Sequence, residues 1–204
     1  NEQERLDFFR FYAEYVNGRV ELLAGTGCIR YADTLALSNA VYELGYTPMV
    51  ISPYYFEMDQ EKLFVYYDRL AKDVKGDLYL YNFPPRTGHS IAPETIRRLI
   101  DANPNIIGLK DSVSTPGHTN MVCRAIEGKP FTVYSGFDDQ FLSNIANNGG
   151  GGCIGALSII VPEIWSSLVK AANEKDFDRT FALYHLIQKL MPIYDMDTNC
   201  SLIL

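Results

Sequence analysis

Short apolar runs alternate with segments of helical periodicity along almost the whole chain. Glycine, proline and polar residues bound these runs, so each run is predicted to be a strand. The expected strands are residues 20–24, 49–51, 78–81, 106–109, 131–134 and 153–157. The expected helices are residues 1–17, 33–44, 60–74, 93–101, 116–127, 138–147, 162–173 and 177–190, with a further helix beginning at Thr198. Runs that are apolar at successive positions are typical of parallel strands covered by helices.

This alternation allows two architectures, an open doubly wound sheet or a closed barrel. A (β/α)8 TIM barrel typically needs about 250 residues, whereas this chain has 204 residues and six strand–helix units. The reactive side chains that follow the strands favour the barrel. We therefore expect an α/β fold in which the chain forms units three to eight of a (β/α)8 barrel and lacks the first two strands. Residues 1–175 are expected to form this partial barrel, and residues 176–204 to begin a C-terminal helical region.

The composition excludes several classes of partner. The formal net charge of −7 argues against binding to nucleic acid or to an anionic membrane surface, and no apolar run is long enough to span a bilayer. The four cysteines form no C-x-x-C pair and the three histidines are scattered, so we expect no metal and no cofactor. Free thiols and the lack of a secretory signal favour a cytoplasmic location.

Two residues that end neighbouring strands are candidates for catalysis, because the active site of a βα barrel lies at the carboxyl ends of its strands. Lys110 directly follows the apolar run 106–109. Burial there would favour the neutral amine that Schiff-base chemistry requires, although a lysine at a strand end is more often a solvated rim residue. Tyr81 ends the preceding strand, and its phenol is placed to transfer protons. The alternative for Tyr81 is an aromatic residue that only lines the barrel.

Loops at the same edge supply further candidates. Arg86 follows two prolines just after Tyr81 and is suited to bind a carboxylate, although a surface arginine is an equal alternative. Tyr55 follows another strand, and loop aromatics of this kind often reach into a partner subunit. Residues 150–155 fit G-x-G-x-x-G, but a nucleotide fingerprint must follow a strand and open a helix. Here the glycines are expected to follow a helix and to form a tight turn before a strand, which argues against a nucleotide site.

Two longer motifs make the chain similar to a known family. Residues 81–88 (YNFPPRTG) and 107–112 (IGLKDS) resemble the signature pair of the dihydrodipicolinate synthase/N-acetylneuraminate lyase family. Residues 24–27, 52–55, 135–138 and 149–155 support the resemblance, in the order and spacing of that family. The resemblance implies a class I aldolase on a (β/α)8 barrel that binds pyruvate or another 2-keto acid as an imine, usually as a tetramer.

The same resemblance implies a role for each site residue. Lys110 would form the Schiff base, and Tyr81 would transfer protons and contact the keto-acid carboxylate. Tyr55 would reach across a tight-dimer interface to complete a proton relay. The Ile154 carbonyl would lie beside bound pyruvate, and Gly136 would line the floor of the pocket. The Gly-Thr-Thr-Gly-Glu loop of the family, which binds the pyruvate carboxylate, is absent from these 204 residues.

Within the family, two reactions remain open. An arginine at the position of Arg86 implies a dihydrodipicolinate (4-hydroxy-tetrahydrodipicolinate) synthase, which condenses pyruvate with aspartate semialdehyde. Residues 110–112 (KDS) are instead similar to the 2-keto-3-deoxy-sugar-acid aldolases, which release pyruvate and an aldehyde. We expect the synthase, with the aldolase as the alternative and a catalytically silent binding protein as a third, weaker candidate. The expected partners are pyruvate, a small aldehyde and further copies of the chain, arranged as a dimer of dimers.

Overall fold

Six strands and the helices between them make up most of the fold. The computed structural model describes residues 2–196. The strands are β1 (Leu22–Gly25), β2 (Tyr46–Ile51), β3 (Leu78–Asn82), β4 (Ile106–Asp111), β5 (Thr132–Ser135) and β6 (Gly150–Cys153). The helices up to β6 are α1 (Glu2–Val16), α2 (Tyr31–Tyr42), α3 (Gln60–Asp73), α4 (Pro84–Thr87), α5 (Pro93–Ala102), α6 (Pro116–Ala125), the 3-10 turn η1 (Asp138–Gln140) and α7 (Phe141–Ile145). The C-terminal helices are α8 (Leu157–Ile160), α9 (Pro162–Asn173), α10 (Phe177–Leu190) and α11 (Ile193–Met196).

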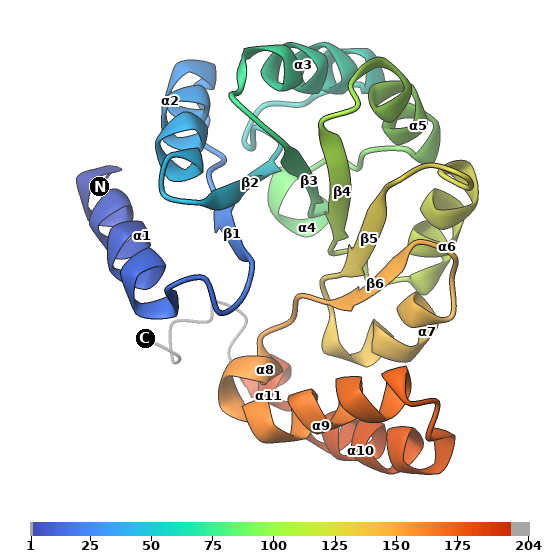
Figure 1. The fold of residues 1–204 in the computed structure, drawn as a ribbon. Coiled ribbons are helices and arrows are strands. Elements are labelled where there is room, and N and C mark those ends of the chain that lie inside the picture. The colour runs from blue at the N-terminus through green and yellow to red at the C-terminus, as the bar shows by residue number, and fades with distance from the viewer. Residues whose placement is uncertain (1, 197–204) are drawn as a thin grey trace.

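All six strands are parallel and pair in the order in which they occur along the chain. A doubly wound sheet reverses its strand order at a switch point, and this sheet has no such reversal. Because β-α-β crossovers are right-handed, an unreversed order places every connecting helix on the same face. The sheet accordingly curls, with the helices along its outer side (Figure 1). The expected α/β fold is confirmed, and the curled sheet is consistent with a TIM-barrel-like arrangement.

Local sequence signals explain where the helices begin. The Asp59 side chain accepts a hydrogen bond from the Lys62 N–H at 2.8 Å and so caps α3. Proline occupies the first turn of α4, α5, α6 and α9, where its missing N–H costs no helical hydrogen bond. Residues 84–85 begin the short helix α4. In the part of the chain that the structure describes, no helix is long and apolar enough to cross a membrane.

The main core lies between the outer face of the sheet and the helices. Strand residues that alternate along β3 and β4, such as Leu80 and Leu109, point outward and are fully buried against α3, α5 and α6. A second core joins α7 to the C-terminal helices and contains Phe141, Trp165 and Leu168. The intervening strand residues face the inner side of the curl, where the candidate catalytic side chains lie.

The predicted last strand was wrong in its position. Residues 150–153 form β6, whereas the expected strand 153–157 ends in α8, which begins at Leu157. The glycines were taken for a turn, but they pair with β5 instead. Gly152 has φ +112°, and a Cβ on Gly150 would come 1.9 Å from the Asn144 carbonyl oxygen. Only glycine fits both requirements, so side-chain pattern could not mark this segment as a strand.

Two further expectations concern the last third of the chain. The helix expected over residues 138–147 is divided into η1 and α7. The helix expected to begin at Thr198 lies outside the described residues. Helices α9 and α10 are confirmed close to their expected bounds.

Candidate active site

Lys110 and Tyr81 meet on the inner side of the sheet, near the carboxyl ends of β4 and β3. The register pairs Tyr81 with Lys110 and Lys110 with Tyr134, so three neighbouring strands present these side chains in one row. The Lys110 Nζ atom lies over the Tyr81 ring, 4.6 Å from its centroid. Tyr81 in turn stacks on Phe83, with ring centroids 5.8 Å apart and an interplanar angle of 21°. The aromatic pair thus holds the lysine amine at the strand end, half-buried.

Two further aromatic contacts lie one step down the inner side of the sheet from this row, and we call them the aromatic floor. Tyr79, only 8% exposed, pairs with Gly108, and its ring lies 6.1 Å from that of Tyr134. A Cβ on Gly108 would come 2.0 Å from the Tyr79 ring, so glycine is required where the ring crosses β4. Burial and neighbouring Tyr134 raise the pKa of Tyr79 to about 12, which keeps this phenol neutral. Period-two alternation from Tyr81 and Lys110 would have identified this floor, which the sequence analysis missed.

Asp111 is the second site residue that the sequence analysis did not single out. It follows Lys110 in β4, faces the opposite side of the sheet and is fully buried. Its Oδ1 accepts a hydrogen bond from Asn82 Nδ2 at 2.8 Å. Its Oδ2 accepts from Thr119 Oγ1 at 2.7 Å and from His118 Nδ1 at 2.9 Å. One carboxylate therefore joins β3, β4 and α6 on the side of the sheet opposite Lys110.

The His118–Asp111 contact makes one contribution to stability depend on pH. Burial alone lowers the pKa of His118, but the hydrogen bond and the negative charge of Asp111 outweigh it and raise the pKa above the ordinary 6.5. Protonation of His118 therefore stabilises the fold, fully below about pH 6.5, and this contribution is lost as pH rises through the raised pKa. We expect His118→Gln to lose stability relative to the wild type at about pH 6, and less so at about pH 8.

Urea unfolding at several pH values between about 6 and 8 measures this difference. Comparing each variant with the wild type cancels the contribution of His89, whose pKa burial lowers. The exposed His185 on α10 provides the control His185→Gln, for which we expect no such change with pH. A stability difference for His118→Gln that stays constant over this range would contradict the prediction.

Cys153 ends β6 and pairs with Ser135 in β5. Burial and the charge of Asp138 raise the pKa of its thiol to about 12, against the smaller lowering effects of a hydrogen bond with Ser135 and of Lys110. A thiol with so high a pKa stays protonated near neutral pH and is a poor nucleophile. Cys153, Cys28 and Cys123 are free thiols, as the sequence led us to expect, and Cys200 lies outside the described residues.

The remaining candidates lie around this centre at different distances from it. Arg86 is exposed on α4, which directly follows β3 and Tyr81. Ile154 is half-buried after β6, and its N–H donates to the Ser135 carbonyl at 2.9 Å. Gly136 donates its N–H to the Asp111 carbonyl at 2.9 Å, and a Cβ there would come 1.8 Å from Ser112 Oγ. Glycine is therefore required at residue 136 by the packing of Ser112.

Tyr55 lies apart from the lysine–tyrosine pair. It follows β2, has φ +79° and is 86% exposed. Its ring contacts that of neighbouring Phe56, with centroids 5.2 Å apart, and Phe56 and Tyr54 are exposed as well. These three residues form an aromatic surface patch, which we call the β2 aromatic patch.

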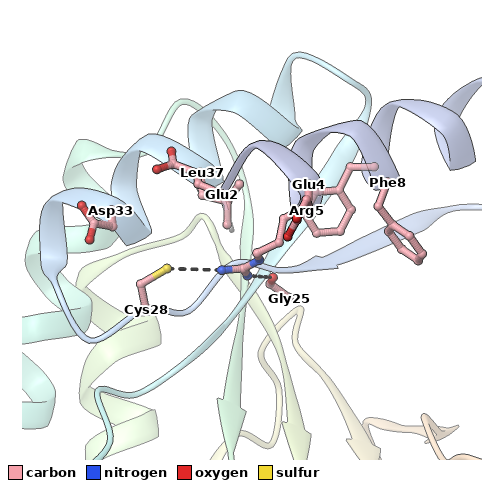
Figure 2. Close-up of a pocket in the computed structure, with 9 residues that line it drawn as sticks. Glu2, Glu4, Arg5, Phe8, Gly25, Cys28, Asp33 and Leu37 are labelled. Carbon is pink, nitrogen blue, oxygen red and sulfur yellow. Dashed lines mark hydrogen bonds between the residues drawn. The ribbon is translucent and has the colours of Figure 1, made fainter. Parts of the chain in front are cut away.

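A cavity of about 740 Å³ lies at the flank of β1, between α1 and α2. Figure 2 shows Arg5 reaching from α1 to the end of β1, where it donates to the Gly25 carbonyl at 2.6 Å and to Cys28 Sγ at 3.4 Å. Neither Lys110 nor Tyr81 lines this cavity, so it is separate from the candidate catalytic centre. Over residues 2–196, no group of three or more His, Cys, Asp and Glu side chains is arranged to hold a metal ion.

Known proteins resemble the chain in both sequence and structure. The model of the dihydrodipicolinate synthetase family matches residues 1–204. "Putative 2-dehydro-3-deoxy-D-gluconate aldolase YagE" from Escherichia coli K12 is 32% identical over 199 residues, which cover 96% of this chain and 66% of that protein. The 4-hydroxy-tetrahydrodipicolinate synthase of Kosmotoga olearia is 33% identical over 200 residues, covering 97% and 67%. The chain thus spans about two thirds of the length of these relatives.

Solved structures agree with the sequence comparison. The crystal structure of YagE in complex with pyruvate superposes with a TM-score of 0.93 at 30% identity, over 98% of this chain and 68% of that one. Dihydrodipicolinate synthase from Aquifex aeolicus gives a TM-score of 0.90 at 26% identity, over the same shares of the two chains. The chain therefore belongs to the dihydrodipicolinate synthetase family, whose members are pyruvate-dependent lyases.

Proposed function

We propose that the protein is a class I aldolase in which Lys110 forms an imine with pyruvate. The observation that carries this proposal is the Lys110 amine held over the Tyr81 ring at the carboxyl end of the sheet. The amine adds to the keto carbon of pyruvate, and the carbinolamine then loses water to give the imine. The imine withdraws electrons from the neighbouring carbon, which can then form or break a carbon–carbon bond. The crystallised pyruvate complex of YagE supports pyruvate as the shared substrate.

Tyr81 acts as the proton carrier in this proposal. The Lys110 amine lies over its ring, 4.6 Å from the centroid, which supports a role for this phenol in moving protons as water leaves. The Ile154 carbonyl, just beyond β6, faces the bound keto acid, and Gly136 borders the floor of the pocket. No metal or cofactor takes part in this chemistry, because the protonated imine itself accepts the electron pair.

For the second substrate, we propose aspartate semialdehyde, as in a 4-hydroxy-tetrahydrodipicolinate synthase. Arg86 supports this choice, because its guanidinium stands on α4 at the catalytic edge and is suited to bind a second carboxylate. A 2-keto-3-deoxy-sugar-acid aldolase is the alternative, favoured by the similarity to YagE. A catalytically silent binding protein is the weakest candidate, since Lys110 and Tyr81 are both present and in contact.

Borohydride reduction of the full-length protein in the presence of pyruvate tests the imine. We expect a stable adduct that peptide mass mapping places on Lys110. A folded sample that shows no adduct would exclude the aldolase and favour the binding protein.

Arg86→Ala then separates the two reactions. We expect it to lower kcat/KM for aspartate semialdehyde by about 10²-fold, since a charged hydrogen-bonded clamp contributes about 1.5–3 kcal/mol. For sugar-derived aldehydes, which lack that carboxylate, kcat/KM should fall much less. Equal small losses with both substrates would remove the basis for proposing the synthase.

We also propose that the six units belong to a (β/α)8 barrel with residues 1–175 as its partial barrel and residues 176–204 as the start of a C-terminal helical region. Within the described residues, β1 and β6 are the two edges of the sheet and do not pair with each other, which leaves room for two more strands. The β2 aromatic patch supports a homo-oligomer, a dimer of dimers, in which Tyr55 enters the site of a neighbouring copy.

A further inference from the structure

The C-terminal helices contact the strand ends through the hydroxyl of Tyr194, in α11. This hydroxyl donates a hydrogen bond to Asp138 Oδ2 at 2.5 Å. It also accepts one from the Ala156 N–H at 3.1 Å. Asp138 follows β5 and Ala156 follows β6, so one hydroxyl joins three segments that are far apart in the sequence.

Asp138 is an unusual partner, because its side chain is fully buried. Its Oδ1 atom has no hydrogen-bond partner within the described residues. Its carboxylate packs directly on Gly155, where a Cβ would come 2.3 Å from Oδ2. The Tyr194 hydroxyl donates a hydrogen bond to this buried carboxylate. Removing that donor is costly, because a buried carboxylate without a hydrogen-bond donor is strongly disfavoured.

Three consecutive residues after β6 are held by these contacts. The Ile154 N–H donates to the Ser135 carbonyl, Gly155 packs on the Asp138 carboxylate, and the Ala156 N–H donates to Tyr194. Lys110 pairs with Tyr134 in β5, and Tyr134 pairs with Gly152 in β6. The held segment therefore leaves the carboxyl end of the sheet two strands away from the candidate catalytic amine.

We infer that Tyr194 and Asp138 are positioning residues that hold residues 154–156 in place, so that the Ile154 carbonyl faces the keto acid bound at Lys110. This inference rests on the proposed imine at Lys110. Tyr194 and Asp138 touch the segment rather than the reacting atoms. Losing their contact therefore weakens the binding of pyruvate more than it affects the chemistry on Lys110. The C-terminal helices thereby become part of the binding site although they contribute no catalytic group.

Tyr194→Phe tests the inference, because it removes only the hydroxyl. Adduct formation under borohydride is measured against pyruvate concentration in the full-length protein. We expect the half-saturating pyruvate concentration to rise about tenfold, while labelling at saturation stays at the wild-type level. The matched control is Tyr184→Phe, whose hydroxyl donates from α10 to the Asp139 carbonyl. Tyr184→Phe should change the half-saturating pyruvate concentration less than twofold.

A double-mutant cycle shows whether Tyr194 acts through Asp138. Asp138→Asn keeps the volume beside Gly155 and removes the charge. If the two residues act as one unit, the double variant should bind pyruvate as well as the single variant that binds it less tightly. If the double variant instead loses affinity for pyruvate by the product of the two single losses, the two residues act independently and the proposed coupling is wrong.

Hydrogen–deuterium exchange gives a readout that does not depend on the imine. Tyr194→Phe should speed exchange in residues 154–157 relative to both the wild type and Tyr184→Phe. Unchanged exchange, or unchanged half-saturation with pyruvate, would overturn the positioning role. If the wild type forms no adduct at any pyruvate concentration, the proposed function fails, and the exchange data still decide whether Tyr194 holds this segment.

Discussion

Lys110→Arg is expected to abolish the borohydride adduct with pyruvate and to lower kcat by at least about 10³-fold, because the covalent route is lost. Arginine retains the positive charge that lies over the Tyr81 ring, 4.6 Å from its centroid in the wild type. It cannot supply a neutral amine near pH 7, since its guanidinium stays protonated there. The variant therefore separates the electrostatic role of the residue from its role as a nucleophile.

Mass spectrometry of the reduced protein and steady-state kinetics with pyruvate and an aldehyde measure this effect. Lys170→Arg is the control, because Lys170 is exposed on α9 and its Nζ atom lies 3.9 Å from Glu174 Oε1. We expect this control to keep the wild-type rate. An adduct that persists in Lys110→Arg would mean that another amine reacts with pyruvate, and the site would have to be reassigned.

Asp111→Ala is expected to reduce the free energy of unfolding by about 3–5 kcal/mol, which is the cost of removing one partner from a buried charged network. The substitution leaves three donors without their acceptor, on Asn82, His118 and Thr119. All three belong to elements that meet directly behind Lys110, so loss of order there should also lower activity. Urea unfolding at about pH 7 measures the change in stability.

Two variants make this result specific. Asp111→Asn keeps the size of the side chain and one acceptor oxygen, so it should lose clearly less stability than Asp111→Ala. Asp101→Ala removes an exposed carboxylate that pairs with Arg97 and Lys129, and we expect a far smaller effect. Equal losses for Asp111→Ala and Asp101→Ala would show that the Asp111 network contributes little to the fold.

The order of the secondary structure elements was largely predictable from the sequence, because hydrophobic periodicity and proline or glycine boundaries act locally. Six elements begin and end within two residues of their expected bounds: helices α1, α3, α5 and α9 and strands β3 and β4. Strand β6 was misplaced because its glycines carry no side-chain pattern, and the contacts that require glycine there come from residues elsewhere in the chain, such as Asn144.

The candidate site was predictable only in part. Lys110 and Tyr81 were identified because each ends an apolar run, and the register of β3 and β4 brings them together as expected. The alternation along β3 and β4 also places Tyr79 on the face of Tyr81 and Asp111 on the opposite face, although neither residue was singled out. The contact between Tyr194 and Asp138 joins residues that are 56 positions apart, and no local pattern indicates it.

Three properties could be read from the amino-acid sequence: the alternation of strands with helices, a lysine and a tyrosine that end neighbouring strands, and the family that the chain resembles. These properties depend on residue type and spacing along the chain. The folded structure was needed to show that Asp111 is held by three donors from β3 and α6, and that α11 contacts the segment after β6. Those features arise from contacts between distant residues, whose geometry depends on how the whole chain packs.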